Sequence, residues 1–534
     1  MAAGEGSAGR RRHPRGGFVA LALGVYVLCA LWATWPAVRH VDGHYLARPA
    51  PGYGEAAAGD HLQLGWSFWL VGHQLERGAA PWADPYSFRP EAEAPVNLQG
   101  LLLGLPFWPL DRLWGPVWAY DLLVLLSVVA AGGLACWWLR SLGLGRAAAL
   151  AGGLVFALQP YRVGQSTGHL LGLVSFLLPA TLLALERHRM WLAAACLAAI
   201  PLSGQLHLAL GAVPLALGYA WARLPRRLWW RAAAAGAAAA GAAVLVQVSV
   251  VRGSIAGGRS FAQVERYSAE LSDLVTRAVG AGVEELVFLG WLTPLLALAG
   301  LVLAWPRQRG LAVFLGVAAV VPILLALGAN LPLYEPLWDA LPPLRSARVP
   351  ERLMPIACLA LAALAALALQ RLVTDRHRAG AAIGVAAAVM VLLALDLRVP
   401  VFGAVSADLP SPAYAAIRGE GRLLELPVFR PDIHFGSVYL GYARQAPRER
   451  PQGYSTLAPP AADRLARELR GLSCGRGPVP AELGVRFVAV HRGLFRQSEF
   501  FAPACAARAE QRLRGDGWRL LARDGPVSTW ARER

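Results

Sequence analysis

The sequence predicts a mainly α, polytopic transmembrane protein with about eleven spans and a small C-terminal α/β domain. Three observations carry this prediction. The 534 residues are 56% hydrophobic and only 16% charged, with a mean hydropathy of +0.43, which is too apolar for one soluble domain of this size. Eleven apolar stretches have lengths near the roughly 20 residues that cross a bilayer. The connectors between these stretches alternate between arginine-rich and acid-bearing.

The first span follows a basic segment and resembles a signal peptide. It is nevertheless as long as a bilayer is thick and ends in Trp32, Trp35 and Pro36, without a small-residue cleavage site, so we expect a retained helix. Residues 100–113 are apolar but short and are broken by Pro106 and Pro109, which favours a re-entrant or interfacial piece over a span. The eleven spans are expected near 17–37, 117–139, 146–160, 169–185, 190–204, 206–222, 232–250, 285–304, 310–328, 353–370 and 380–397.

The charges orient the chain. With the N-terminus in the cytoplasm, the inner segments hold 17 arginines and two acids, whereas the outer connectors hold 13 arginines and 15 acids. This distribution satisfies the positive-inside rule. The odd number of spans then places the tail outside the cytoplasm. The net charge of +17 is spread over thin loops beside apolar spans, where anionic membrane lipids are the natural partner, so nucleic-acid binding is not expected.

The expected domains are a cytoplasmic basic segment 1–16, a transmembrane domain 17–398 with a long first outer connector 38–116, and an extracytoplasmic α/β domain 399–534. In the tail, residues 422–427, 485–490 and 518–522 have the pattern of strands, and an Asp524-Gly525 turn leads into a fourth at 527–531,. Helical patterns lie between them at 461–472 and 504–513. The localisation expected is the cell (inner) membrane.

The first outer connector is far longer than an ordinary loop, and such excess is usually functional. Asp60 opens an amphipathic, aromatic helix that we expect to lie at the membrane interface,. Its carboxylate either only caps this helix, or it accepts a proton from an acceptor hydroxyl or binds a metal ion; composition alone favours the cap. A proline-bounded loop with Trp82 and Asp84 suits stacking on a sugar ring, although an interfacial aromatic belt explains its rings nearly as well.

Cationic side chains in two other outer connectors are candidates for binding a phosphate. Arg162 and His169 lie between two spans and could hold a phosphate or shuttle a proton, although His169 is about as readily a histidine satisfied by the backbone at a helix start,. Arg345, Arg348 and Arg352 lie just outside the tenth span. Positive charge there opposes the orienting bias, and guanidinium groups match phosphate oxygens.

Of the six cysteines, only Cys474 and Cys505 lie outside the apolar spans. Both fall in the tail, which the topology places on an oxidising side of the membrane, so we expect them to form a disulfide. The cysteines show no metal-binding pattern. No cofactor is predicted; a divalent metal is compatible with the chain but no motif supports one.

Four short motifs give the chain a resemblance to bacterial polytopic glycosyltransferases of the GT-C superfamily. They are Gly59-Asp60 before an aromatic helix, Asn97-Leu98 after a proline, Gly168-His169 opening a span, and 348–352 opening a late one. The resemblance implies a polyprenyl-phosphate-linked sugar donor, transfer to a glycan, lipid or protein acceptor on the outer face, and an essential acid that corresponds to Asp60. Many members have an acidic pair there; this chain has glycine beside the aspartate, which puts metal dependence in doubt.

A second function class stays open, namely a non-catalytic transporter, flippase or scaffold for lipid-linked glycans. Transporters are typically built from repeated halves with broken helices at mid-membrane. The sequence shows no internal repeat, which favours the enzyme.

Overall fold

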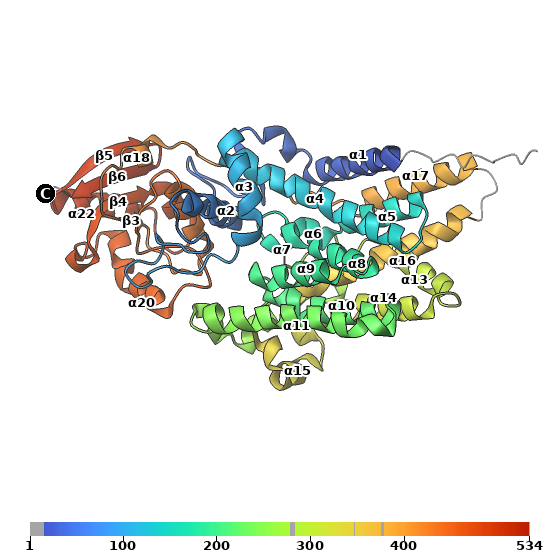
Figure 1. Ribbon diagram of the computed structural model, residues 1–534. Helices are drawn as coiled ribbons and strands as arrows, with labels where there is room; N and C mark the ends of the chain where they lie inside the picture. Colours follow the sequence, from blue (N-terminus) through green and yellow to red (C-terminus); the bar gives the residue numbers. More distant parts are fainter. Residues whose placement is uncertain (1–14, 278–283, 347, 375–378, 533–534) are drawn as a thin grey trace, which may run out of the picture.

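The computed structural model describes residues 15–277, 284–346, 348–374 and 379–532. An elongated bundle of apolar helices forms one end of the molecule, and the sheet of the tail forms the other (Figure 1). Of the expected basic N-terminal segment, residues 1–14 lie outside the described part of the chain, as does the inner loop at 375–378.

A helix or helix pair stands at each of the eleven predicted spans, so the chain is a multi-pass membrane protein. Within the described residues, five helical stretches are long and apolar enough to cross a membrane alone, and several shorter apolar helices accompany them. The helices are α1 (Arg15–Thr34), α4 (Pro116–Ser141), α5 (Arg146–Leu158), α7 (Leu170–Val174), α8 (Leu177–Glu186), α9 (Met190–Leu202), α10 (Leu206–Arg223), α11 (Trp229–Val246), α13 (Leu292–Ala304), α14 (Arg309–Ala326), α16 (Met354–Thr374) and α17 (Ala379–Asp396).

Two boundaries differ from the expectation. The span expected at 169–185 consists of α7 and α8, and His169 precedes the first of them. The span expected from 285 begins at Leu292, because Gly290 turns the chain with a φ of 80° and the Asp396 carboxylate accepts hydrogen bonds from the amides of Trp291 and Leu292 at 3.0 and 2.9 Å. A carboxylate at these orphan amides fixes where the helix starts.

Small residues set the packing of the bundle. Helix α16 is almost entirely buried and packs against α5, α13 and α14. At its crossing with α13, Gly300 lies so close to the carbonyl of Leu364 that a Cβ would be 1.8 Å from that oxygen. The alanine and glycine content of these helices therefore permits close backbone approach, as is usual between membrane helices.

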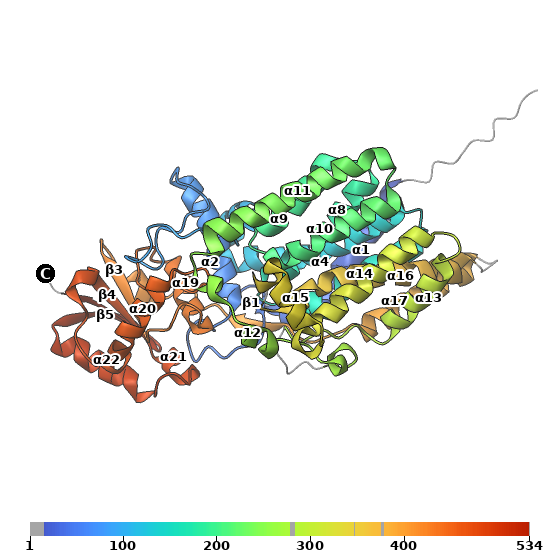
Figure 2. The ribbon, with the colours of Figure 1, turned by 90° about the horizontal axis from the view of Figure 1, so that it is seen from below.

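Residues 100–113 form the helix α3 (Leu101–Trp114), which Gly115, with a φ of 82°, separates from α4. It packs against α2 (Asp60–Glu76) and α4. The expectation of a single apolar face on α2 is wrong, because residues on several faces of the helix, from His61 to Gln74, are buried. Figures 1 and 2 both place α2 between the helix bundle and the tail, so it is covered by protein.

The tail contains a four-stranded sheet in the order β3-β4-β6-β5. The parallel pair β3 (Arg422–Leu426) and β4 (Val485–His491) is joined by a crossover that contains α19 (Ser437–Ala443) and α20 (Pro460–Leu469). Helix α21 (Arg492–Gln497) and α22 (Ala504–Gly515) follow, and β5 (Trp518–Asp524) and β6 (Val527–Arg532) form the expected hairpin. All four strands predicted from the sequence are therefore confirmed.

The first outer connector and the tail interlock, which the sequence did not indicate. Strand β1 (His44–Ala47) pairs antiparallel with β2 (Gly403–Ser406). Beyond this pair, the amide of Ala56 donates to the Tyr442 hydroxyl and the amide of Gly59 donates to the Ser437 hydroxyl, each at 3.0 Å. The segment that leads to Asp60 is thus held by the tail on its approach to α2.

Candidate active site

A cavity of about 920 Å³ opens where the connectors of the membrane domain meet the tail. Its wall is built from the start of α2, the segment before α7, the region of Glu284, the segment before α16, and three pieces of the tail. Asp60, His169, Arg348 and Arg352, four residues chosen from the sequence, all line it. Asp60 and Arg352 are 292 positions apart in the chain and His169 lies between them, so the fold brings these segments together.

Asp60 lies at the wall of this cavity and is bound on both carboxylate oxygens. The Tyr454 hydroxyl donates to Oδ1 at 2.6 Å, and Nε2 of His169 lies 2.8 Å from Oδ2. The expectation that Asp60 caps α2 is wrong: Gly59 is the N-cap, and no side-chain capping bond is present there. The carboxylate is turned away from the helix amides because stronger donors from two distant segments face it.

His169 connects Asp60 to a second carboxylate. Its Nδ1 lies 2.8 Å from Oε1 of Gln165 and 3.6 Å from Oε1 of Glu284. The amide nitrogen of Gln165, in α6 (Pro160–Gln165), donates to Oε2 of Glu284 at 2.8 Å. Arg352 completes the series through Nη2, 2.5 Å from Oε1 of Glu284. A continuous line of polar contacts therefore runs from Tyr454 through Asp60, His169 and Glu284 to Arg352.

The charges in this line reinforce one another. Burial alone would raise the pKa of Asp60, yet the hydrogen bonds from His169 and Tyr454 outweigh burial and hold this pKa well below its ordinary value,. The Asp60 side chain is 26% accessible and lines the cavity. Burial alone would lower the pKa of His169, whereas the carboxylates of Glu284 and Asp60 raise it above the ordinary value. The arrangement therefore favours the ion pair of an ionised Asp60 and a protonated His169.

Close backbone approach makes the pair possible. A Cβ at Gly168 would lie 3.3 Å from the amide of His61 and 3.4 Å from the Cβ of Asp60. The shorter contact is tighter than most Cβ contacts in proteins, so glycine lets the segment before α7 come this close to α2 without a shift of the backbone at His61. This close packing explains why glycine precedes His169.

The two arginines before α16 differ in their surroundings. Arg352 is neutralised by Glu284, with which it makes two hydrogen bonds through Nε and Nη2. Arg348 instead places its guanidinium 5.6 Å from the centre of the Tyr267 ring. Within the described part of the chain, its buried Nε has no hydrogen-bond partner. Of the two, Arg348 is the better placed to bind an anion in the cavity.

Four residues expected to bind substrate, Arg162, Arg345, Trp82 and Asp84, lie outside the lining of this cavity. Arg162 is fully buried and donates to the carbonyl oxygens of Ala157 and Gly172, which satisfies the break between α5 and α7. Arg345 donates to the backbone carbonyls of Trp338 and Asp339 in the preceding helix α15 (Tyr334–Ala340).

Asp84 has a structural role in the proline-bounded loop. It accepts hydrogen bonds from the amides of Tyr86 and Ser87, from the Ser87 hydroxyl and from the Trp66 indole. With these bonds made, its carboxylate fixes the loop against α2. Trp82 is 52% exposed on the outside of the same loop.

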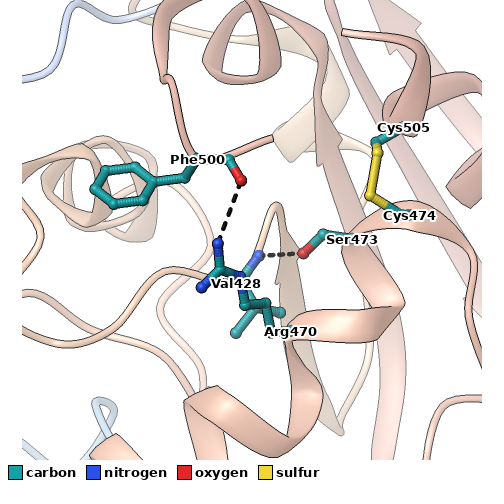
Figure 3. Close-up of a disulfide and its surroundings, with 6 residues drawn as sticks. All are labelled: Val428, Arg470, Ser473, Cys474, Phe500 and Cys505. Carbon is teal, nitrogen blue, oxygen red and sulfur yellow. Dashed lines mark hydrogen bonds between the residues drawn. A yellow bond between two sulfur atoms is a disulfide. The ribbon is translucent and has the colours of Figure 1, made fainter. Parts of the chain in front are cut away.

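The tail forms the opposite rim of the cavity through Asp432, His434, Gln497, Glu499 and Phe500. Figure 3 shows how this rim is anchored: the Arg470 guanidinium donates to the Phe500 carbonyl, and Cys474 is joined to Cys505 by a disulfide. The two cysteines chosen from the sequence are therefore bonded and fix the segment that carries Phe500.

Sequence reasoning missed Tyr454, Gln165 and Glu284. Gln165 lies three residues after Arg162 in a connector that was recognised as polar, so its position was a usable signal. Tyr454 and Glu284 lie in segments without a motif, and nothing local distinguishes them from other tyrosines and glutamates.

Comparisons with known proteins bear on the fold. No family profile matches the chain, and no curated protein sequence does. Arabinofuranosyltransferase AftD from Mycobacteria superposes on 98% of this chain with a TM-score of 0.59 at 17% identity. The chain covers 40% of the length of that protein.

Two further structures have the same arrangement. The Archaeoglobus fulgidus oligosaccharyltransferase in the apo form superposes on 92% of this chain, which covers 72% of it, with a TM-score of 0.51 and 12% identity. ArnT from Cupriavidus metallidurans in the apo state matches over 97% of both chains with a TM-score of 0.50 and 16% identity. At these identities the likeness shows the fold, which is the GT-C-like membrane fold expected from the sequence.

Proposed function

We propose that the protein is an integral membrane glycosyltransferase that moves a sugar from a polyprenyl-phosphate-linked donor to a glycan, lipid or protein acceptor at the outer face of the membrane. One observation carries the proposal: an ionised carboxylate, Asp60, and an arginine with an unused donor, Arg348, line the same cavity. The fold is shared with two proteins named for glycosyl transfer, which supports this reaction class.

Glycosyl transfer requires two charge changes that this cavity can serve. The acceptor hydroxyl loses a proton as it attacks the anomeric carbon, and the carboxylate of Asp60 is the group placed to receive that proton. The donor phosphate gains charge as it leaves, and the guanidinium of Arg348 is placed to stabilise it. Arg352 keeps Glu284 ionised and so acts on the donor only indirectly.

The residues present do not fit a metal at Asp60. Both of its carboxylate oxygens face donors, the Tyr454 hydroxyl and the imidazole Nε2 of His169, where a cation would need free lone pairs,. Among the described residues, no group of three or more His, Cys, Asp and Glu side chains is arranged to hold a metal ion.

We further propose that the N-terminus is cytoplasmic, that 399–534 is an extracytoplasmic domain, and that the membrane is the cell (inner) membrane. The arginine asymmetry and the disulfide between Cys474 and Cys505 support this orientation,. A reporter that is active only outside the cytoplasm, fused after Arg534, is expected to work, and the same reporter in the loop at Arg226 is expected to fail. The reverse pattern would refute the topology.

The catalytic proposal is tested with the purified full-length protein and a panel of synthetic polyprenyl-phosphate sugars and oligosaccharide acceptors. The readout is release of polyprenyl phosphate, which does not depend on the identity of the acceptor. Asp60→Asn should lower turnover by roughly a hundredfold or more, the usual scale for a lost general base. Asp42→Asn, at an exposed position of the same connector, is the matched control and should retain activity.

The outcomes separate the two function classes. Donor binding without release by the wild-type protein would favour the transporter or scaffold. Full activity of Asp60→Asn would end the assignment of Asp60 as the proton acceptor. Because this carboxylate does not cap α2, loss of activity in the asparagine variant cannot be ascribed to a lost cap.

A further inference from the structure

The hydrogen bonds around His169 fix where its protons lie. Glu284 is held ionised by Arg352, and an ionised carboxylate only accepts hydrogen bonds,. Gln165 must therefore present its NH2 group to Glu284, which leaves its carbonyl oxygen facing Nδ1 of His169 at 2.8 Å. A carbonyl oxygen cannot donate, so Nδ1 of His169 must carry a proton.

This tautomer leaves Nε2 of His169 as the nitrogen that exchanges a proton. Nε2 faces Oδ2 of Asp60 at 2.8 Å, so one proton lies between these two atoms whenever the imidazole is protonated on Nε2. Tyr454 keeps its own proton as a donor to Oδ1, because burial and the neighbouring Asp60 charge hold the pKa of its phenol well above the ordinary value. The hydrogen bond between Nε2 of His169 and Oδ2 of Asp60 therefore holds the exchangeable proton.

A weak base on its own is poorly suited to deprotonating a hydroxyl, because proton transfer is most effective when the pKa of the base is near the working pH. Asp60 carries two hydrogen bonds that weaken it, while the imidazole beside it faces two carboxylates that strengthen it. We propose that Asp60 and His169 act as one proton-accepting dyad, in which His169 finally holds the acceptor proton and Gln165 and Glu284 fix its tautomer. This inference rests on the proposed function and names the group that completes its proton transfer.

The acceptor oxygen forms a bond to the anomeric carbon, and the bond from that carbon to the phosphate oxygen breaks, with its electron pair passing to the phosphate. The proton of the acceptor hydroxyl passes to Oδ2 of Asp60 and from there to Nε2 of His169. The dyad is ready when Nε2 is unprotonated and loaded when the imidazolium pairs with Asp60, as the short contact between them indicates.

The proposal predicts a pH dependence with a definite sign. Activity should rise with pH through an inflection above the ordinary histidine pKa of about 6.5, because only the ready form accepts a proton. A sugar phosphodiester and a sugar hydroxyl do not titrate in this range, so the inflection reports the protein. The charged and titratable groups that face His169 directly are Asp60, Glu284 and Arg352. Those farther around the cavity wall are Arg48, His61, Arg266, Tyr267, Glu285, Arg348, Asp432, His434, Tyr454 and Glu499.

The test is the pH profile of kcat/KM for polyprenyl phosphate release by the full-length protein. His169→Gln retains a donor to Asp60 and should lower the rate at least tenfold and abolish the inflection. Glu284→Gln should move the inflection to lower pH, because it removes the anion opposite Nδ1 and leaves Arg352 unneutralised, and both changes disfavour the imidazolium. His188→Asn, an exposed histidine at a φ of 56° that asparagine tolerates, is the matched control and should leave the profile unchanged,.

A purely structural role for His169 would change rates without moving the inflection. The dyad is wrong if the wild-type profile shows no inflection above about 6.5, if His169→Gln retains it, or if Glu284→Gln moves it to higher pH. Any of these results together with an inactive Asp60→Asn leaves the proposed function standing. An active Asp60→Asn removes the proposed function itself. The wild-type profile alone decides the matter if a variant fails to fold.

Discussion

The stability of the tail should depend on the protonation of His491, which lies at the junction between the sheet and the first outer connector. The ring is fully buried. Its Nδ1 lies 2.6 Å from Oε2 of Glu55, and its Nε2 lies 3.2 Å from Oε2 of Glu425. Arg450, also fully buried, donates to the other oxygen of Glu425 at 2.9 Å. Only a protonated His491 makes this group of two cations and two carboxylates neutral.

The size of the effect follows from the pKa of His491. Burial acts to lower this pKa, but Glu55 and Glu425 raise it from 6.5 to about 9. A shift of about 2.5 units at about 1.4 kcal/mol each corresponds to roughly 3 kcal/mol. Because the folded-state pKa is the higher one, this stability is fully present below pH 6.5 and is lost as the pH rises through about 9,.

The assay is thermal unfolding of the purified full-length protein between about pH 6 and 10, for the wild type, His491→Gln and the control His188→Asn. For a unit the size of the tail, a loss of about 3 kcal/mol lowers Tm by roughly 6 to 12 °C. This loss should appear in the wild type and in the control, whereas His491→Gln should start lower and show less dependence on pH. Parallel curves for the wild type and His491→Gln would refute the reasoning.

Three further changes have expected outcomes. Tyr454→Phe removes one hydrogen bond to the Asp60 carboxylate and should lower kcat/KM by roughly tenfold or more, on the scale of about 1.5 to 3 kcal/mol for a charged hydrogen bond, with the fold intact by size-exclusion chromatography. Arg348→Ala should weaken donor binding by about the same free energy, and Arg348→Lys should restore the affinity only in part. The control Arg345→Ala should bind the donor as the wild type does. Equal donor affinities of these three variants would exclude Arg348 from the donor site. Cys474→Ser opens a loop of 31 residues and should destabilise the tail by roughly 3 kcal/mol in the chain-entropy model, measured by denaturant unfolding, with no change expected in a reduced sample.

Most of the fold was predictable because its signals are local. Apolar length located a described helix or helix pair at each of the eleven expected spans, and alternation of apolar residues located the four strands of the tail sheet. The pairing of β1 with β2 was not predictable, because it joins His44 to Ser406 across the whole membrane domain. Nothing in a four-residue strand specifies a partner so distant in the chain.

The candidate site was predictable only in part, because a local sequence signal does not specify which distant residues a side chain will contact. His169 and Arg348 carried a signal because polar residues beside apolar spans need an explanation. Arg162 carried the same signal, and its explanation is internal: it satisfies carbonyl groups that a broken helix leaves without partners. A sequence gives the residue type and its neighbourhood, but whether an arginine faces a cavity or a helix end depends on tertiary packing.

The dependence of Asp60 on distant partners has a consequence for how the site is assembled. Oδ1 is bound by Tyr454 from the tail, whereas Oδ2 is bound by His169 from the membrane domain. Glu55, five residues before Asp60, accepts from the Leu494 amide and contacts His491, both in the tail. The approach to α2 is therefore clamped by the tail, and deprotonation of His491 should loosen the same segment that positions the proposed proton acceptor. Loss of activity at high pH is expected to accompany the loss of tail stability, on the opposite side of the pH profile from the inflection of the dyad.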